Sequence, residues 1–129
     1  MPYPVETKLS LVDLDDVAEA AALVLTEDGH SGATYELAGT LPMSQIEISE
    51  TFSRALNKTV RAEPETTELW AQRARSAGMD ANQLETLVRM FQAYARDGLK
   101  GNPNVLGWLL QRLPTSLASF AARRAAAQA

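Results

Sequence analysis

Four acidic residues lie within positions 13–19, namely Asp13, Asp15, Asp16 and Glu19. Carboxylates at this density can hold a hard cation or carry out acid–base chemistry. A calcium-binding loop requires glycine at its sixth position and glutamate at its twelfth, but counting from Asp13 those positions hold Ala18 and Val24. Capping of a helix and complementing its dipole explain the acidic residues more simply. We therefore predict structural carboxylates and no metal site.

The only histidine, His30, lies between acidic and small residues, and the chain has no cysteine. A zinc site or a Ser/His/Asp relay would have to be assembled around His30 from distant carboxylates. The composition therefore favours a solvated loop histidine. Disulfides and thiolate nucleophiles are excluded, and a reducing, cytoplasmic location is expected.

The glycines do not form a dinucleotide-binding loop. Such a loop has the pattern GxGxxG between a strand and a helix, whereas this chain has only shorter pairs at positions 29/32 and 98/101. A Tyr-x-x-x-Lys pair, which supplies the proton in many carbonyl reductases, is absent as well, because each tyrosine is followed four positions later by threonine or glycine. We expect no cofactor-binding residue and no catalytic residue in this chain.

Large apolar side chains in the second half could line a substrate pocket. The candidates are Trp70, Met90, Tyr94 and Trp108. At helical spacing such residues more often belong to the core, and this is the interpretation for the neighbouring Phe91. The same four residues could instead form a partner interface, or enclose a small apolar ligand.

Length and charge narrow the class of protein. The chain has 129 residues, 46% of them hydrophobic, which fits a single domain over 1–129. Its net charge is −4, which disfavours binding to nucleic acid. No uncharged apolar run approaches the roughly 20 residues of a membrane span, and residues 1–8 lack the features of a signal peptide. We expect neither a membrane nor a nucleic-acid partner.

The hydrophobic pattern predicts a helix-rich α+β fold with about five helices and three short strands. Residues 1–8 are expected to be extended and residues 125–129 to be frayed. The strands are predicted at 9–12, 33–38 and 59–62. Asp13 or Asp15 is predicted to cap a helix that extends to Leu25, which is apolar on every face after Glu19 and should therefore be central.

Five later stretches have helical features. Ser44 and Glu47 fit a capping box, and the acidic residues at 63, 65 and 68 are expected to open a helix that ends before Gly78. Asp80 should cap the following helix, which has a periodic apolar face from Leu84 to Tyr94. A short helix is predicted at 105–112, and Thr115 is predicted to cap the last one.

Three stretches occur in the order seen in NmrA-like atypical short-chain dehydrogenases, and the chain resembles that family from about Pro4 to Phe120. They are Val12–Ala21, Thr34–Gly39 and Leu113–Leu117. The resemblance implies a C-terminal, substrate-side part of the fold, a truncated Rossmann-type subdomain. In the full-length family NAD(P)H is bound by a glycine-rich loop that precedes the stretch corresponding to Met1, so no cofactor residue can be transferred to this chain.

A missing nucleotide half has consequences for partners and function. It should leave the apolar helix at 16–25 and the edge of the strand around Tyr35 uncovered, which favours a homodimer or a complex with a separate nucleotide-binding chain. We expect the helical cap of an NAD(P)-dependent oxidoreductase that is not catalytic by itself. The alternative is a stand-alone, non-catalytic module for ligand binding, dimerisation or regulation.

Overall fold

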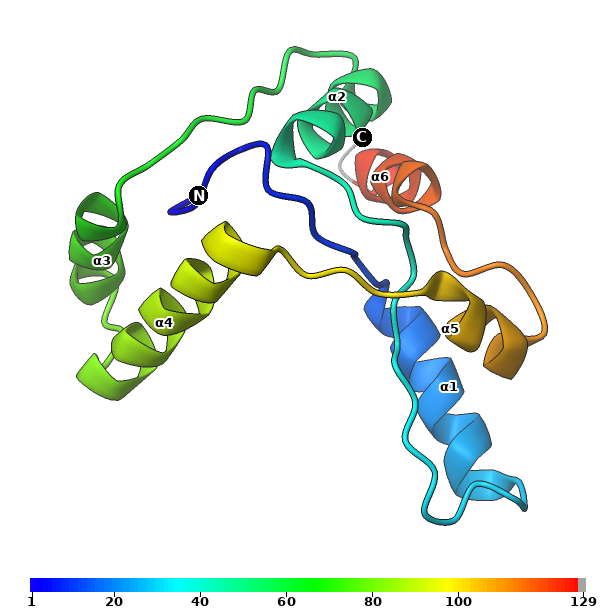
Figure 1. Ribbon diagram of the computed structural model, residues 1–129. Coiled ribbons are helices and arrows are strands. Elements are labelled where there is room, and N and C mark those ends of the chain that lie inside the picture. Colours follow the sequence, from blue (N-terminus) through cyan, green and yellow to red (C-terminus); the bar gives the residue numbers. More distant parts are fainter. Residues whose placement is uncertain (128–129) are drawn as a thin grey trace.

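Three pairs of helices form an arch in the computed structural model, which describes residues 1–127 (Figure 1). The pairs are α1 with α5, α2 with α6 and α3 with α4. The α3–α4 pair and the α1–α5 pair are the two ends of the arch, and α2 and α6 join them (Figure 1). The helices are α1 Leu14–Thr26, α2 Gln45–Leu56, α3 Thr67–Ser76, α4 Ala81–Asp97, α5 Pro103–Leu110 and α6 Leu117–Ala126.

Each of these helices begins at a side chain that accepts a hydrogen bond from a backbone N–H of the first turn. Asp13, Ser44 and Asp80 act in this way, which confirms three predicted caps, and Ser44 and Glu47 form the reciprocal capping box. The predicted cap at Thr115 is wrong, because the neighbouring Ser116 receives the bond from Ser119 N–H. The side chain of Thr115 is engaged elsewhere in the fold.

The predicted boundaries of the shorter helices need correction. Helix α3 begins after Thr66, so of the three acidic residues only Glu68 lies in its first turn. Helix α5 runs over 103–110 instead of 105–112, because Asn102 caps it, Pro103 occupies the first turn and Gln111 leaves the helix with a φ of 52°. The structure has six helices over residues 1–127, in agreement with the expected number of about five.

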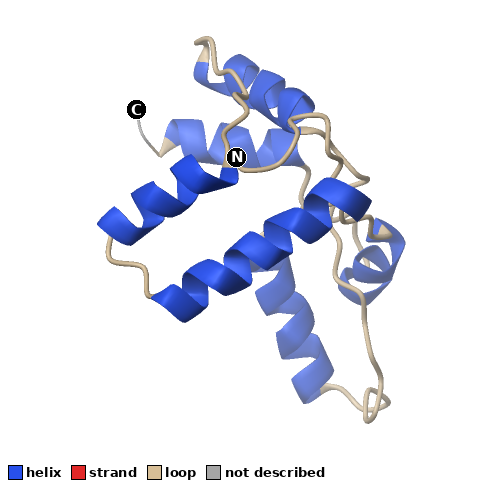
Figure 2. Cartoon of the chain, turned by 60° about the vertical axis from the view of Figure 1, so that its left-hand side comes forward, coloured by secondary structure: helices blue, strands red, loops and turns tan. Residues whose placement is uncertain are grey.

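The three predicted strands are wrong: no strand is present among residues 1–127 (Figure 2). A strand needs a neighbour along its length, and residue 9 has only isolated bridges, antiparallel to Met43 and parallel to Leu99. At the third predicted strand the Ser53 hydroxyl bonds both the N–H and the carbonyl oxygen of Val60, at 2.9 and 3.0 Å, where a neighbouring strand would otherwise bond.

The segment at 33–38 is also extended without a neighbour. Within residues 1–127, the Ala33 N–H donates a backbone hydrogen bond to the His30 carbonyl. The next residue along the chain with such a bond is Gly39, whose N–H donates to the Leu11 carbonyl. The backbone of 34–38 forms no hydrogen bond to another backbone group of the described chain. This stretch therefore presents the unsatisfied edge of a potential strand.

Two small apolar cores stabilise the arch. One gathers Tyr3, Leu9 and Phe91, with Trp70, Leu87, Met90 and Tyr94 packed around them. The other centres on Ala20, Leu106 and Leu110, between α1 and α5. Residues 1–8 are thus more than an extended lead, because they carry Tyr3 into the first core and bond Gln45 N–H through the Val5 carbonyl.

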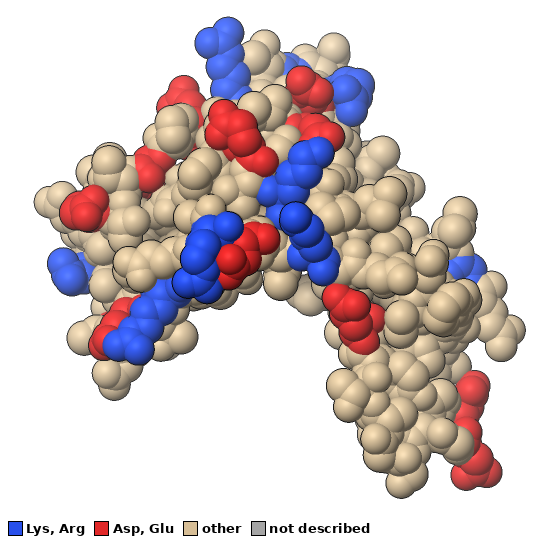
Figure 3. All heavy atoms as spheres, viewed as in Figure 1, with Lys and Arg blue, Asp and Glu red and all other residues tan. Residues whose placement is uncertain are grey.

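The prediction of a central position for the first helix is wrong for this chain by itself. Helix α1 lies at an end of the arch, with Leu14 77% and Leu25 84% exposed. Only the face around Ala20 is buried, because α5 covers that side. Figure 3 shows the end that carries α1 projecting beside a wide hollow.

The C-terminal end is more regular than expected. Helix α6 continues to Ala126, so the predicted fraying at 125–129 is wrong for 125 and 126, while 128 and 129 lie outside the described residues. Among the helices of residues 1–127, none combines the length and apolarity needed to cross a bilayer.

Candidate functional site

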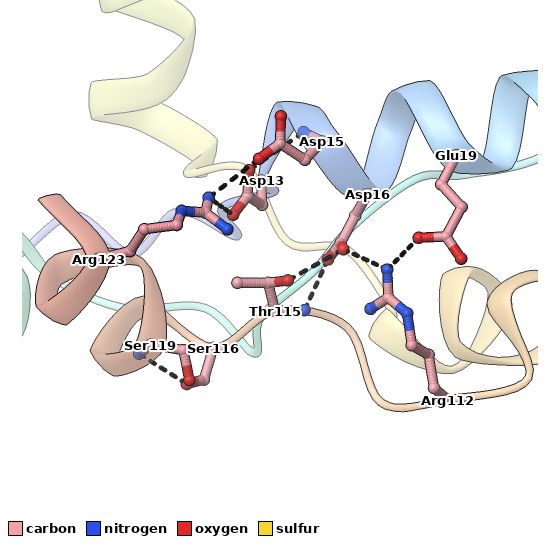
Figure 4. A network of polar contacts seen from close by, with 9 residues as sticks. All are labelled: Asp13, Asp15, Asp16, Glu19, Arg112, Thr115, Ser116, Ser119 and Arg123. Carbon is pink, nitrogen blue, oxygen red and sulfur yellow. Dashed lines mark hydrogen bonds and ion pairs between the residues drawn. The ribbon is translucent and has the colours of Figure 1, made fainter. Parts of the chain in front are cut away.

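The acidic cluster meets the end of the chain in one polar network (Figure 4). Asp16, in the first turn of α1, is 1% exposed. Its carboxylate accepts hydrogen bonds from the Thr115 backbone N–H at 2.6 Å and the Thr115 hydroxyl at 2.9 Å. The Arg112 guanidinium donates a third bond at 2.8 Å and also pairs with Glu19. Asp16 therefore connects α1 to the segment between α5 and α6.

These contacts set the ionisation of Asp16. Burial by itself raises the pKa of this carboxyl, but the Thr115 N–H, the Arg112 guanidinium and the Thr115 hydroxyl all stabilise the ionised form. The net result is a pKa below the usual value for aspartic acid. Asp16 is therefore an ionised, hydrogen-bonded carboxylate at neutral pH. It is not suited to act as a base that exchanges protons with a substrate.

A second ion pair lies beside the first. Asp13 caps α1 through the Asp15 N–H at 3.1 Å, and its other oxygen accepts from Arg123 of α6 at 2.5 Å. Arg123 also reaches Asp15 at 3.2 Å. Arg123 thus has two acidic partners at the start of α1. The start of α1 is thus joined to α6 as well.

The structural role predicted for the acidic residues agrees with this arrangement. The oxygens of Asp13 and Asp16 already receive arginine, hydroxyl and N–H donors, which leaves little capacity for a cation. Across residues 1–127, no group of three or more metal-ligating side chains is found. The network holds these segments of the chain together.

Three of the predicted pocket residues lie together. Trp70, Met90 and Tyr94 pack around the core of Tyr3, Leu9 and Phe91. The Trp70 and Phe91 rings meet edge-to-face with centroids 4.8 Å apart, and those of Tyr3 and Tyr94 do so at 6.1 Å. Burial, with a smaller effect of Tyr94, raises the pKa of Tyr3. The cluster is a packed aromatic wall on α3 and α4, and its role in binding a substrate stays a prediction.

Trp108 is separate from the other three candidates. It lies on α5, in the opposite end of the arch, and is 73% exposed. An exposed tryptophan has a large apolar area available for contact with a ligand or a partner. The four predicted residues therefore divide between the two ends of the arch.

His30 has a partner that the sequence analysis did not identify. Its Nδ1 lies 2.7 Å from the Tyr35 hydroxyl, and the two rings meet edge-to-face. The pair fastens the loop after α1 to the extended segment at 33–38. Within residues 1–127 the side-chain partner of His30 is this tyrosine and not the carboxylate that a catalytic relay would require.

Sequence reasoning missed Arg112 and Thr115 as partners of Asp16. They lie 96 and 99 positions away from it, and no local pattern links residues at such separations. The sequence signal that could have identified them was the recurrence of polar residues within 112–116, between two helices. We interpreted these residues as a helix break followed by a helix cap.

No protein-family model matches the chain. The NAD(P)H azoreductase of Xenophilus azovorans is 28% identical over 122 residues, which cover 95% of this chain and 43% of that protein.

Solved structures give a similar result. The NADPH-dependent quinone oxidoreductase QOR2 of Escherichia coli superposes with a TM-score of 0.79 at 24% identity, covering 95% of this chain and 45% of its own. The triphenylmethane reductase of Citrobacter sp., in complex with NADP(H), superposes at 0.75 with 26% identity, covering 93% and 42%. A nucleoside-diphosphate-sugar epimerase of Staphylococcus aureus superposes at 0.79 with 23% identity.

The chain is thus similar to one part of NAD(P)H-dependent reductases, and it spans less than half the length of these relatives. The resemblance predicted from the three sequence stretches is confirmed at the level of this reductase class. The cofactor expected for the full-length family agrees with the nicotinamide nucleotides named for the relatives.

Proposed function

We propose that this chain is the substrate-side part of an NAD(P)H-dependent reductase and acts with a nucleotide-binding half that it does not contain. The observation that carries the proposal is the match of 95% of the chain to only 43% of an azoreductase. The sequence lacks a glycine-rich pyrophosphate loop, which such an enzyme needs for its nucleotide. The chain by itself is therefore proposed to be non-catalytic.

The exposed surfaces support a missing partner. Along α1, Leu14, Ala18, Ala21 and Leu25 follow one another at helical spacing and are all exposed. A stripe of this kind is normally buried in a folded protein. The unpaired backbone of 34–38 is a second feature that a neighbouring chain would satisfy. We propose that the partner is a separate nucleotide-binding chain or a second copy of this one, and that it is not a membrane or a nucleic acid.

The proposed substrate region is the hollow between the ends of the arch (Figure 3). Trp70, Met90 and Tyr94 belong to one end and Trp108 to the other. Large apolar side chains of this kind suit a substrate with aromatic or other apolar surface. The absence of cysteine fits a reducing compartment, and we include a cytoplasmic location in the proposal.

The proposal is tested by the DNA upstream of Met1 together with ligand binding by the chain. We expect a neighbouring or continuous reading frame that encodes a GxGxxG loop after a strand. We also expect the melting temperature of the chain alone to be unchanged by NADH or NADPH, because a ligand raises it only by binding the folded state. A clear rise in melting temperature with NADH or NADPH would contradict the proposal that a separate half binds the nucleotide.

A stand-alone dimerisation module is the second candidate, and the exposed stripe on α1 favours it. Such a module would form a homodimer through that stripe and would be indifferent to NADPH. No frame for a nucleotide-binding domain would then be found beside its gene. Both candidates predict that NADPH does not stabilise the isolated chain, and they differ in this genomic context.

A further inference from the structure

An apolar cavity lies between the leading segment and the α2–α6 pair, apart from the four pocket residues predicted from the sequence. Its volume is about 330 Å³, within the range of small-molecule sites. The apolar wall includes Leu11, Val12, Ile48, Phe52, Leu117 and Phe120. The Phe52 and Phe120 rings meet edge-to-face with centroids 6.5 Å apart, so α2 and α6 each contribute one aromatic surface.

Each polar side chain on the wall already has at least one hydrogen-bond partner in the protein. Asp13 pairs with Arg123 at 2.5 Å, and the Thr40 hydroxyl accepts from Leu11 N–H at 3.0 Å. The Gln45 amide donates to the Tyr3 hydroxyl at 3.1 Å. The Thr115 hydroxyl donates to Asp16, and Ser116 caps α6.

The polar side chains on the cavity wall determine which kind of ligand can bind there. A ligand that depends on hydrogen bonds would have to compete with these internal partners, and burying its polar groups unpaired would cost free energy. The charges at the wall are paired already, Asp13 with Arg123 and the Met1 ammonium with Glu65, so a charged ligand would find no unpaired opposite charge there. A neutral ligand with almost no polar surface avoids all of these costs.

The volume and the aromatic walls of the cavity narrow the class of ligand further. A dry cavity of about 150 Å³ lined by Leu, Ile and Phe can bind benzene. The present cavity, at about 330 Å³, is roughly twice as large and is partly open to solvent. The edges and faces of Phe52 and Phe120 favour aromatic rings in offset or edge-to-face contact.

We propose that this cavity is a binding site for a neutral aromatic molecule of about two fused rings. The residues that line it come from α2, α6 and other segments of this chain, so the site can be tested with this chain alone. Its occupancy requires no NADPH and would stabilise the contact between α2 and α6. The cavity proposal therefore has its own test, whose result does not depend on whether the reductase proposal holds.

The two isoleucines of the chain provide an internal control. Ile48 lines the cavity, whereas Ile46 is 41% exposed and is not part of its wall. With isoleucine methyl groups labelled with ¹³C, naphthalene titrated into the wild-type chain is expected to shift the Ile48 signal in a saturable manner and leave Ile46 in place. If neither signal moves, or if both move alike, the proposal is overturned.

Matched ligands and variants test the chemistry. A naphthalene sulfonate, which adds a charge to the same rings, should bind at least tenfold more weakly than naphthalene. Leu117→Trp, which fills the cavity, should weaken naphthalene binding at least tenfold, whereas Leu113→Trp at a site that is 89% exposed should not. Equal affinity for both ligands, or unchanged binding by a folded Leu117→Trp chain, would overturn the assignment. The isoleucine measurement decides the question if that variant does not fold.

Discussion

The carboxylate of Asp16 accepts hydrogen bonds from both the backbone N–H and the hydroxyl of Thr115, 99 positions later in the chain. Together with Arg112, these donors surround a buried anion that joins the first helix to the segment before the last one. Together with the ion pairs of Arg123 with Asp13 and Asp15, these bonds connect two regions whose helices pack on other partners, since α1 packs on α5 and α6 packs on α2. Removal of this anion should therefore lower the stability of the whole fold.

Asp16→Ala is expected to lower the free energy of unfolding by about 3 kcal/mol, because it leaves donors at Thr115 and Arg112 without their acceptor. The value is at the lower end of the range for a broken buried pair, since Arg112 is partly exposed and retains Glu19. Urea denaturation followed by circular dichroism measures the loss. Asp15→Ala, an exposed neighbour, is the control and should change stability by about 0.5 kcal/mol or less. Equal losses in the two variants would contradict the role given to Asp16.

The lowered pKa of Asp16 predicts an acid-dependent stability. A carboxyl whose pKa is lower in the folded state contributes stability above its unfolded pKa of about 3.9, and that contribution is lost as the pH falls through the folded value. The difference in urea midpoint between the wild type and Asp16→Ala should therefore be largest near pH 7 and shrink below about pH 4. A difference that stays constant from pH 7 to pH 3 would be inconsistent with an ionised, hydrogen-bonded Asp16.

Two glycines with positive φ should respond differently to alanine. Gly78 has a φ of 90° and open space where a Cβ would lie, whereas Gly98 has a φ of 68° and its Cβ would lie 2.6 Å from the Lys8 carbonyl oxygen. Gly78→Ala should cost about 1 kcal/mol from backbone strain alone. Gly98→Ala should cost clearly more, because the leading segment must also move away from α4. Thermal unfolding of both variants measures the difference, and similar melting temperatures would show that the contact of Gly98 with Lys8 is unimportant.

The stripe on α1 should control self-association if this chain pairs with itself. The wild type is expected to sediment as a homodimer, and Leu14→Lys combined with Leu25→Lys should sediment as a folded monomer, because the two charges would have to be buried in the interface. The matched control is Leu41→Lys combined with Leu113→Lys, which changes two leucines that are similarly exposed but lie outside α1. A well-folded wild-type monomer at high concentration would count against the homodimer and leave the nucleotide-binding chain as the proposed partner.

Local chemistry made most helices predictable. Ser44 with Glu47 and Asp80 before a periodic apolar face specify helix starts through bonds that span three residues or fewer. The strands were not predictable in this way, since alternation at 33–38 indicates an extended segment but says nothing about a neighbour. The aromatic residues show the same limit, because periodicity placed Tyr94 and Trp70 on helices without showing that both belong to the core around Tyr3.

By itself, the sequence determined the helix-rich character, the capped starts of α1, α2 and α4, the lack of a dinucleotide loop and the resemblance to a reductase class. These follow from residue types and short spacings. The tertiary structure alone decided that Asp16 binds Thr115 and Arg112, that Trp108 is separated from the other aromatic candidates, and that an apolar cavity lies between α2 and α6. The physical reason is that such contacts depend on how distant segments pack, and packing free energy is distributed over many residues that no local pattern connects.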